Sequence, residues 1–370
     1  GSSTSSWLKQ RLFSLLLCCS AATMVFGSDF PTDLDVLRTD ALGRFAQAVL
    51  FAVFSLHSIV FCTSSFLLFL WRGGPVTRGL LTSYAALILF DRSPNKGGWM
   101  WAWQVGVVQF LRNSRLWKLG AMGRGPIKMQ RTVPLPVEDG PYIFTVHPHG
   151  IIGVAPMTHL GTNATGFEEL FPNIPVHLLG ASAIFRIPFF REWCLLNGHA
   201  SVERESCTAL LKKRRSIAIA PGGARESLES VPNTMRLILK QRKGFAKLAL
   251  KTGAALVPVL SFGENELYST LQFGEGSWGR WCQERLKKIL GFTMPIFVGL
   301  DWALPLLPKR SPLYTIFGAP IRPDCADFIA DDVQSEVIDA FHAKYCKALC
   351  ELFDKHKASH GLAGATLEIV

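Results

Sequence analysis

The sequence predicts an α/β fold with a mixed, largely parallel sheet flanked by helices, preceded by an N-terminal membrane-embedded helical hairpin. Two observations lead to this prediction. From residue 142 onward, short apolar runs alternate with helical patterns, which is typical of a sheet covered on both faces. Before residue 91, the apolar segments are long and nearly free of charge, which is typical of a chain in contact with lipid.

The composition agrees with a globular domain that is attached to a membrane. Apolar residues make up 49% of the 370 residues, and charged residues only 18%. The formal net charge of +11 suits a partner such as anionic lipid or the polyphosphate of coenzyme A. No zinc-finger spacing or aromatic RNA-binding signature is present, so we expect no nucleic-acid partner. The nine cysteines are scattered without a CxxC pair and predict no disulfide framework.

Residues 1–44 form the first predicted region, an N-terminal segment that is interfacial or flexible. Within it, the apolar stretch 12–27 follows Lys9 and Arg11. This order of charged and apolar residues resembles a signal peptide, and it equally fits an interfacial anchor. The sequence leaves both alternatives open.

Residues 45–90 form the predicted membrane hairpin. The run from Phe45 to Trp71 contains no Asp, Glu, Lys or Arg, and as a helix it could cross a hydrocarbon layer about 30 Å thick. The sequence "RGGP" at residues 72–75 should break the helix, and the apolar run from Gly79 to Phe90 is too short to cross alone. The alternative is a buried helix of a soluble core.

Residues 91–370 form the third predicted region, the sheet domain. Its entry, residues 91–131, is basic and rich in tryptophan, which suits the level of lipid headgroups. Apolar runs predict strands at residues 142–147, 216–220, 254–262, 294–300 and 313–317. Helical patterns cover residues 205–214, 233–252 and 331–356.

The motif "YIFTVHPHGIIG" at residues 142–153 places His147 and His149 just after the first strand of this domain. Reactive groups in open α/β sheets collect at the carboxyl ends of strands. Pro148 restrains the backbone between the two rings, and a neutral imidazole can accept a proton from a hydroxyl near pH 7. The alternatives are histidines bonded to the backbone and a metal site, for which the other histidines and cysteines lack a recognised spacing.

Two further motifs also end apolar strands. "SIAIAPGGARES", residues 216–227, offers the backbone amides of Gly222 and Gly223, with Arg225 as a phosphate donor and Glu226 as a group that could orient a histidine. "SFGENELY", residues 261–268, places Glu264 at the end of another strand. The simpler interpretation of both motifs is a tight turn with solvated or capping charges.

The segment "RKGFAKLALKTGAALVPV", residues 242–259, begins with Arg242 and Lys243 ahead of an amphipathic helix. A phosphate could bind at such a helix start, held by amides and by the two cations. The alternative is ordinary capping. The chain contains no P-loop and no GxSxG motif, which disfavours a P-loop nucleotide site and a serine hydrolase.

Taken together and in order, these motifs resemble the type-2 acyl-CoA:diacylglycerol acyltransferases. The resemblance covers roughly residues 85–370 and includes "LFDRSPNKGG", "FRIPFFREW", "GSWGRW" and "LFDKHKASHGL". It implies a fold similar to the glycerolipid acyltransferases and the transfer of a fatty acyl chain from acyl-CoA to diacylglycerol, giving triacylglycerol. Monoacylglycerol and wax-alcohol acyltransferases share the same blocks, so the acceptor stays open.

The resemblance also implies roles for individual residues. His149 would be the general base and His147 would position it, although these two roles could be exchanged. Glu226 would orient the imidazolium, because the residues after the histidines include no acid. Arg204 in "SVERES" occupies a place similar to an arginine that distant relatives use near the glycerol substrate. The other expected contacts are oxyanion donors at Gly150, Gly222 and Gly223, phosphate ligands at Arg225, Arg242 and Lys243, and a site-lining carboxylate at Glu264.

A thioester is already activated, so we expect acyl-CoA as co-substrate and no metal or other cofactor. The expected partners are membrane lipid, diacylglycerol and acyl-CoA; the sequence allows a homo-oligomer and does not fix the oligomeric state. The resemblance implies the endoplasmic reticulum membrane, with the active site facing the cytosol, and the lipid droplet surface. The alternative to an enzyme is a non-enzymatic lipid-droplet protein.

Overall fold

The computed structural model describes residues 56–99, 101, 105–113, 126–290, 296–299, 308–309, 311–323 and 333–370. The chain divides into two units, residues 1–46 and 47–370, and the first unit lies outside the described residues. The predictions for residues 1–44, and for the part of the hairpin before Leu56, therefore also lie outside them.

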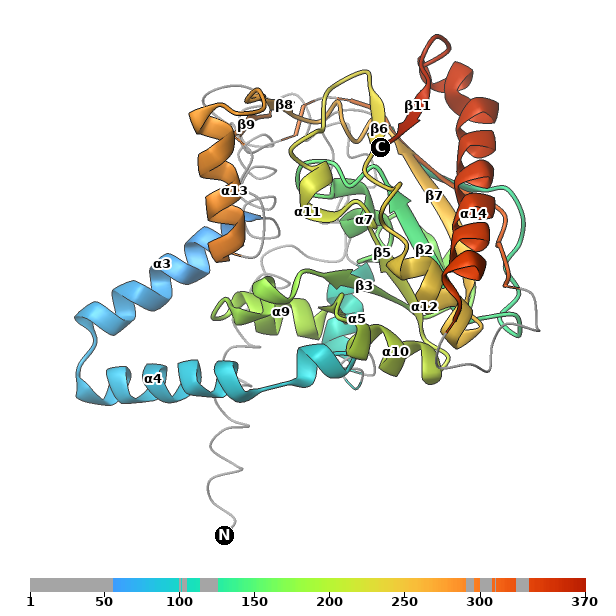
Figure 1. Ribbon diagram of the computed structural model, residues 1–370. Helices are drawn as coiled ribbons and strands as arrows, with labels where there is room; N and C mark the ends of the chain where they lie inside the picture. The colour runs from blue at the N-terminus through green and yellow to red at the C-terminus, as the bar shows by residue number, and fades with distance from the viewer. Residues whose placement is uncertain are drawn as a thin grey trace, which may run out of the picture. The chain divides into compact units, whose positions relative to one another are not determined.

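Helices and strands alternate along most of the described chain (Figure 1). The helices are α3 (Leu56–Arg72), α4 (Pro75–Phe90), η2 (Ser93–Lys96), α5 (Gly106–Asn113), α7 (Val154–His159), α8 (Phe167–Leu170), η4 (Ser182–Arg186), α9 (Phe190–Leu196), α10 (Arg204–Lys212), α11 (Gly223–Glu226), α12 (Gly244–Thr252), α13 (Trp278–Leu290), α14 (Ser335–His356) and η6 (Lys357–His360). The strands are β1 (Ile127–Arg131), β2 (Tyr142–His147), β3 (Val176–Gly180), β4 (Ala200–Ser201), β5 (Ser216–Ile219), β6 (Met235–Leu237), β7 (Ala255–Phe262), β8 (Ser269–Thr270), β9 (Phe297–Val298), β10 (Leu313–Phe317) and β11 (Leu367–Ile369).

The main sheet has seven strands in the order β1-β10-β7-β2-β5-β3-β4. Five neighbouring strands, from β7 to β4, run parallel to one another. Strand β10 is antiparallel to β7, and β1 is parallel to β10. The predicted mixed, largely parallel sheet is therefore confirmed. Because β2 lies between β7 and β5, its carboxyl end is flanked by the carboxyl ends of two parallel neighbours.

Both faces of the sheet are covered, so its central strands are buried on both sides. On one face, side chains such as Ile143 and Leu256 pack with residues of α10, α12 and α14, including Tyr345. On the other face, Phe144 packs with α8 and with other aromatic side chains. All six residues of β2 are buried. This two-sided burial explains why the strand reads as a nearly continuous apolar run.

Several predicted elements agree closely with the structure, and two do not. The predicted strands at 142–147 and 313–317 have exactly the bounds of β2 and β10. The predicted helix over 233–252 is wrong in its first half, because residues 235–237 form β6, which pairs with the C-terminal strand β11. In the predicted strand 294–300, only Phe297 and Val298 are a described strand, and they pair with β8 outside the main sheet.

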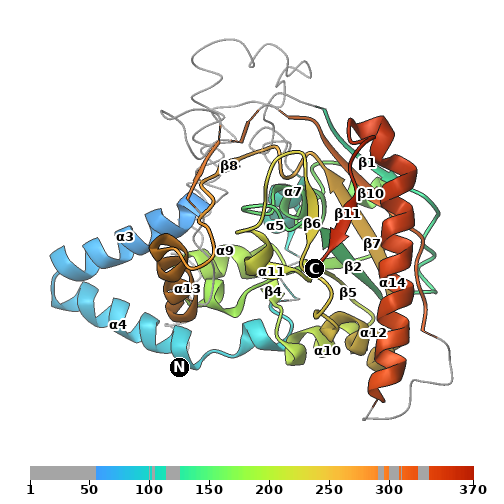
Figure 2. The ribbon, with the colours of Figure 1, turned by 45° about the horizontal axis from the view of Figure 1, so that its top comes forward.

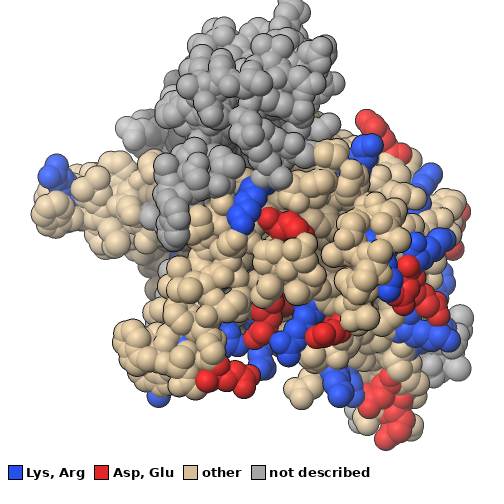
Figure 3. Space-filling model, turned by 90° about the horizontal axis from the view of Figure 1, so that it is seen from above, with Lys and Arg blue, Asp and Glu red and all other residues tan. Residues whose placement is uncertain are grey.

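Helices α3 and α4 are joined at Gly73 and Gly74, so the predicted helix break is confirmed. Large apolar side chains are exposed on both helices. In Figure 3 the arm that projects at the left is tan apart from Lys or Arg atoms at its tip. The exposed set includes Phe61, Phe69, Trp71, Leu80, Leu89 and Phe90. Among the described residues, no helix has both the length and the hydropathy required to cross a bilayer. Membrane attachment of this hairpin stays a prediction.

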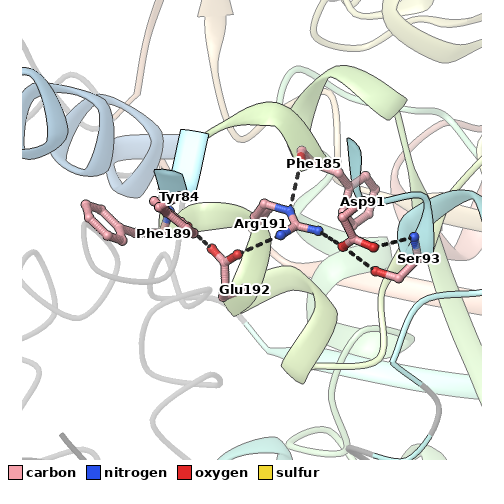
Figure 4. A network of polar contacts seen from close by, with 7 residues as sticks. All are labelled: Tyr84, Asp91, Ser93, Phe185, Phe189, Arg191 and Glu192. Carbon is pink, nitrogen blue, oxygen red and sulfur yellow. Dashed lines mark hydrogen bonds and ion pairs between the residues drawn. The ribbon is translucent and has the colours of Figure 1, made fainter. Parts of the chain in front are cut away.

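A buried arginine joins the end of α4 to α9, as Figure 4 shows. The guanidinium of Arg191 is 1% exposed, donates to the carbonyl of Phe185 at 3.1 Å, and forms ion pairs with Asp91 and, at 2.9 Å, with Glu192. The hydroxyl of Tyr84 on α4 donates to Glu192 and accepts the backbone N–H of Phe189 at 2.9 Å. The orientation of α4 on the sheet domain therefore depends on a charged group that water does not reach.

Replacing Arg191 by Met should lower the free energy of unfolding strongly, because it removes the cation shared by Asp91 and Glu192. Since both carboxylates are about a quarter exposed, we expect a loss near the lower end of about 3–5 kcal/mol. The matched control is Arg92→Met, which breaks the exposed pair with Glu205 and should cost about 0–1 kcal/mol. Denaturant unfolding of both variants in detergent measures the difference, and equal losses would contradict the role given to Arg191.

Candidate active site

Three loops meet at the carboxyl ends of β7, β2 and β5. The loop after β2 carries the HPHG motif, the loop after β5 carries PGGARE, and the loop after β7 carries GENE. This sheet edge is where open α/β sheets collect reactive groups. These motifs are far apart in the sequence. The parallel pairing of the three strands brings them together.

The carboxylate of Glu226 binds the HPHG loop through its backbone. One oxygen accepts the N–H of His149 at 2.6 Å, and the other accepts the N–H of Ile238 at 3.0 Å. Burial raises the pKa of this carboxyl to about 7, although the two amides and the charge of Arg242 act in the opposite direction. The structure differs here from the sequence-based prediction, in which Glu226 orients the ring of the histidine. In the structure it fixes the main chain on which that ring is carried.

Glu264 holds the other end of the same loop. Its two oxygens accept the backbone N–H groups of Val154 at 2.9 Å and Ala155 at 2.7 Å, at the first turn of α7. Burial raises the pKa of this carboxyl to about 7 as well. Glu264 was predicted to line the substrate site, and the structure gives it a different role. Its side chain is 1% exposed, and both of its oxygens accept hydrogen bonds from backbone amides.

Gly150 permits this arrangement because it has no side chain. Its φ of +65° lies in the left-handed region, and a Cβ atom there would be 2.3 Å from Oε1 of Glu264. Gly222 is similarly constrained, since a Cβ atom would be 1.9 Å from Oε2 of Glu226. Each carboxylate thus approaches a glycine so closely that no other residue type fits without a shift.

The loops after β5 and β7 are also bonded to each other. Ser230 donates its hydroxyl to Oδ1 of Asn265 at 2.7 Å, and Nδ2 of Asn265 donates to the carbonyl of Thr234 at 3.0 Å. The backbone N–H of Asn233 donates to Glu266 at 2.9 Å. The three loops therefore form one connected network around the HPHG motif, and the two glutamates of the GENE sequence each have a structural partner.

His149 is the partly exposed histidine of the motif. Its Nδ1 lies 2.9 Å from the carbonyl oxygen of Gly150. A carbonyl can only accept, so Nδ1 carries the hydrogen and the lone pair of the neutral ring is on Nε2. Burial lowers the pKa of this imidazole, while the bond to Gly150 raises it by a smaller amount. The ring is therefore neutral at pH 7, with Nε2 able to accept a proton.

His147 has a different environment, because it lies on β2 under α14. Its side chain is 0% exposed, and its Nε2 is 2.9 Å from the hydroxyl of Tyr345. The same hydroxyl is bonded to Thr145, which lies on the same face of the strand. Burial lowers the pKa of His147 to about 3. An exchange of roles between the two histidines is thus disfavoured, since no substrate hydroxyl reaches a ring without exposed surface. Tyr345 was not predicted, and no local motif marks it.

The cations predicted to bind substrate differ in their exposure and in their ion pairs. Arg242 and Arg225 are exposed, and Arg242 is near enough to Glu226 to affect its pKa. Lys243 instead forms an ion pair with Asp339 of α14 at 2.6 Å, which the sequence did not indicate. Arg204 is exposed at the first residue of α10, directly after the edge strand β4. Strands β5 and β3 separate β4 from β2, so Arg204 lies toward the outer end of this sheet edge.

The backbone donors also differ from one another. The N–H of Gly223 donates to the carbonyl of Ala220 at 3.0 Å, so its predicted role as an oxyanion donor is not available in this structure. Gly150 and Gly222 remain candidates for that role. Within the described ranges, no group of three or more His, Cys, Asp or Glu side chains is placed to hold a metal ion. The expected absence of a cofactor stays a prediction.

Known proteins match most of this chain. A family model described as diacylglycerol acyltransferase matches residues 74–370. The chain is 41% identical to diacylglycerol O-acyltransferase 2A of Umbelopsis ramanniana, over 73% of this chain and 75% of that protein. It is 40% identical to diacylglycerol O-acyltransferase 2 of Danio rerio, over 75% of this chain and 76% of that protein. It is 39% identical to diacylglycerol O-acyltransferase 2 of Homo sapiens, over 75% of this chain and 71% of that protein. Among solved structures, the 1-acyl-sn-glycerophosphate acyltransferase PlsC of Thermotoga maritima matches with a TM-score of 0.35 and 12% identity, over 79% of this chain and 97% of that chain.

The close approach of Glu264 to Gly150 generates a prediction. Gly150→Ala should lose stability through its positive φ and also through the contact with the carboxylate. Gly276→Ala is the matched control, because Gly276 has a φ of +78° and open space around it. We expect the control to lose about 1–2 kcal/mol and Gly150→Ala to lose roughly 1–3 kcal/mol more, as measured by denaturant unfolding. Equal losses would mean that Glu264 does not restrict this turn.

Proposed function

The chain belongs to the diacylglycerol acyltransferase family, and we propose that it transfers a fatty acyl group from acyl-CoA to the free hydroxyl of diacylglycerol, with His149 as the general base. The observation that carries this proposal is the lone pair on Nε2 of a partly exposed histidine, at the edge where three parallel strands end. The names of the relatives support the acyl transfer, and the geometry of the loop supports the choice of His149.

The proposed reaction needs a proton acceptor and a proton donor in turn. Nε2 of His149 takes the proton of the acceptor hydroxyl while the oxygen attacks the thioester carbonyl. The tetrahedral intermediate then expels the coenzyme A thiolate, which receives the proton from the imidazolium. The product is triacylglycerol together with free coenzyme A, and the histidine returns to its neutral form. General-base assistance of this kind is worth about 10²–10⁴-fold in rate.

Glu226 and Glu264 are positioning residues in this proposal. They hold the backbone on either side of the HPHG turn, so the ring of His149 and the bond from its Nδ1 to Gly150 keep their orientation. The backbone amide of Gly150 or Gly222 would stabilise the oxyanion, a contribution of roughly 10²–10³-fold. Because a thioester is activated without a Lewis acid, the proposed mechanism has no step that requires a metal.

We assign the coenzyme phosphates to Arg242 and Arg225, and the acceptor side to Arg204. Both of the first two guanidiniums are exposed next to the loop that carries Glu226. A guanidinium offers a fork of donors to a phosphate group. Lys243 contributes less in this assignment, because its charge is shared with Asp339.

We also propose that the protein works at a membrane surface, on the endoplasmic reticulum with the active site facing the cytosol, and on lipid droplets. The exposed apolar side chains of α3 and α4 support attachment to lipid. Diacylglycerol and triacylglycerol are insoluble in water, so an enzyme held at the interface meets its acceptor without extracting it.

His149→Ala should lower the rate of coenzyme A release in the presence of diacylglycerol by about 10²–10⁴-fold, because the proton acceptor is removed. The assay uses purified protein in detergent with oleoyl-CoA. His356→Gln is the control, because His356 lies at the end of α14 and carries no proposed role. Thermal unfolding of both variants separates a loss of catalysis from a loss of fold. Full activity of a folded His149→Ala protein would remove His149 from its role.

The acceptor is tested by a panel that contains diacylglycerol, monoacylglycerol and a long-chain alcohol with radiolabelled oleoyl-CoA. We expect the highest kcat/KM for diacylglycerol, and the loss in His149→Ala should be similar for every acceptor because each presents a hydroxyl. A clear preference for monoacylglycerol or for the alcohol would replace the proposed substrate but keep the proposed chemistry. Lipid association without any release of coenzyme A would instead indicate a non-enzymatic lipid-droplet protein.

A further inference from the structure

Helix α13 exposes its tryptophans and buries two polar side chains, unlike an ordinary surface helix. Its two tryptophans face outward, with Trp278 80% exposed and Trp281 52% exposed. Two described side chains on its inner face are polar: Gln283 is 6% exposed and the side chain of Arg280 is 12% exposed. An amphipathic helix in contact only with water would place these residues the other way round.

The inner face is fixed, so the helix cannot rotate to bury its tryptophans. The guanidinium of Arg280 forms an ion pair with Glu229 at 2.8 Å, and the backbone N–H of Arg280 donates to the hydroxyl of Ser277 at 3.2 Å. Gly279 packs against the ring of Phe273, where a Cβ atom would be 2.3 Å from a ring carbon. The outward position of the indoles is therefore built into the fold.

The outer face combines aromatic and cationic groups. The guanidinium of Arg285 lies 5.1 Å from the ring centre of Trp281, one helical turn earlier. Lys288 follows Arg285 by three residues and is also exposed. The one acidic residue of this helix, Glu284, faces Arg280 at 3.7 Å. Tryptophan and arginine or lysine on one helix face are typical of a helix that lies in a membrane interface.

Exposed apolar side chains also occur shortly before and after α13 in the chain. Leu271 and Ile296 are each more than half exposed, and the backbone N–H of Leu271 donates to the carbonyl of Ile296 at 2.9 Å. Figures 1 and 2 place α13 on the side of the sheet domain from which α3 and α4 project, and α14 on the opposite side. Helix α13 is thus on the same side of the sheet domain as helices α3 and α4.

We propose that the outer face of α13 is a second lipid-contact surface, which binds an anionic bilayer with Trp278 and Trp281 in the interface and Arg285 and Lys288 on headgroup phosphates. The cations favour a negatively charged surface, whereas an apolar protein partner would leave both of them without a counter-charge. The proposal concerns lipid contact alone and does not depend on the acyl-transfer chemistry.

The first test measures whether the indoles of α13 enter the bilayer. The full chain is reconstituted with phosphatidylcholine vesicles that contain phosphatidylserine, with and without brominated acyl chains, which quench tryptophan on contact. The signal of interest is the fluorescence lost in the variant W278F/W281F relative to the parent. We expect bromine to quench this component strongly. The fluorescence of Trp99, obtained in the same way from the variant W99F, should be quenched much less by bromine, because Trp99 packs against the buried cluster around Phe185.

The second test measures the contribution of the two cations. Arg285→Gln/Lys288→Gln should reduce the quenching of the α13 tryptophans on vesicles with phosphatidylserine to the level on phosphatidylcholine alone. The matched control is Lys344→Gln/Lys347→Gln, two exposed lysines of α14, which should leave the quenching unchanged. Three results would overturn the proposal: no quenching of these tryptophans, equal quenching in both charge variants, or protection of the indoles by concentration-dependent self-association instead of lipid.

Discussion

The site depends on one constraint: two carboxylates are buried beside the turn that follows β2, and each must find donors there. Burying a carboxylate without partners is costly, and Glu226 and Glu264 meet this requirement with backbone amides of the turn itself. The two acids come from the loops after the neighbouring strands β5 and β7, so the turn is held from both sides. Close approach at Gly150 and Gly222 follows from the same constraint.

The burial of β2 on both faces gives the two histidines of the motif different properties. Side chains alternate along a strand, so His147 lies on the same face as Thr145, and both bond to the hydroxyl of Tyr345 from α14. His149 comes after the strand has ended and keeps part of its surface exposed. One ring therefore joins the sheet to its covering helix, while the other keeps part of its surface exposed at the end of the strand.

Much of the sheet could be predicted from the sequence, because buried strands such as β2 and β10 are short, apolar and bounded by turn residues. The stretch 233–243 could not, since its apolar residues fit a helical spacing and its strand β6 forms only by pairing with β11. That pairing joins residues far apart in the chain, which no local pattern reveals. Elements whose structure comes from a distant partner are thus the ones that local periodicity assigns wrongly.

The placement of the candidate residues at one sheet edge was predictable, and their contacts were not. Strand ends in a parallel sheet pointed to His149, Glu226 and Glu264, which the fold does bring to one edge. Whether a carboxylate binds a ring or a main-chain amide depends on loop geometry of a few ångströms, and the sequence carries no signal for that. The ion pair that occupies Lys243 likewise involves Asp339 on a helix from another part of the chain.

The most direct test of the central claim is the dependence of kcat/KM on pH for acyl transfer to diacylglycerol. Burial lowers the pKa of His149, so its neutral form predominates at pH 7 and is lost as the pH falls below the ordinary imidazole value of about 6.5. The predicted rate falls as the pH decreases, first near pH 7, where Glu226 and Glu264 are protonated and hold the turn less firmly, and further below about 6.5, where His149 itself is protonated. A rate that stays constant or rises as the pH falls through this range would contradict the account, because the proposed base must be a neutral imidazole.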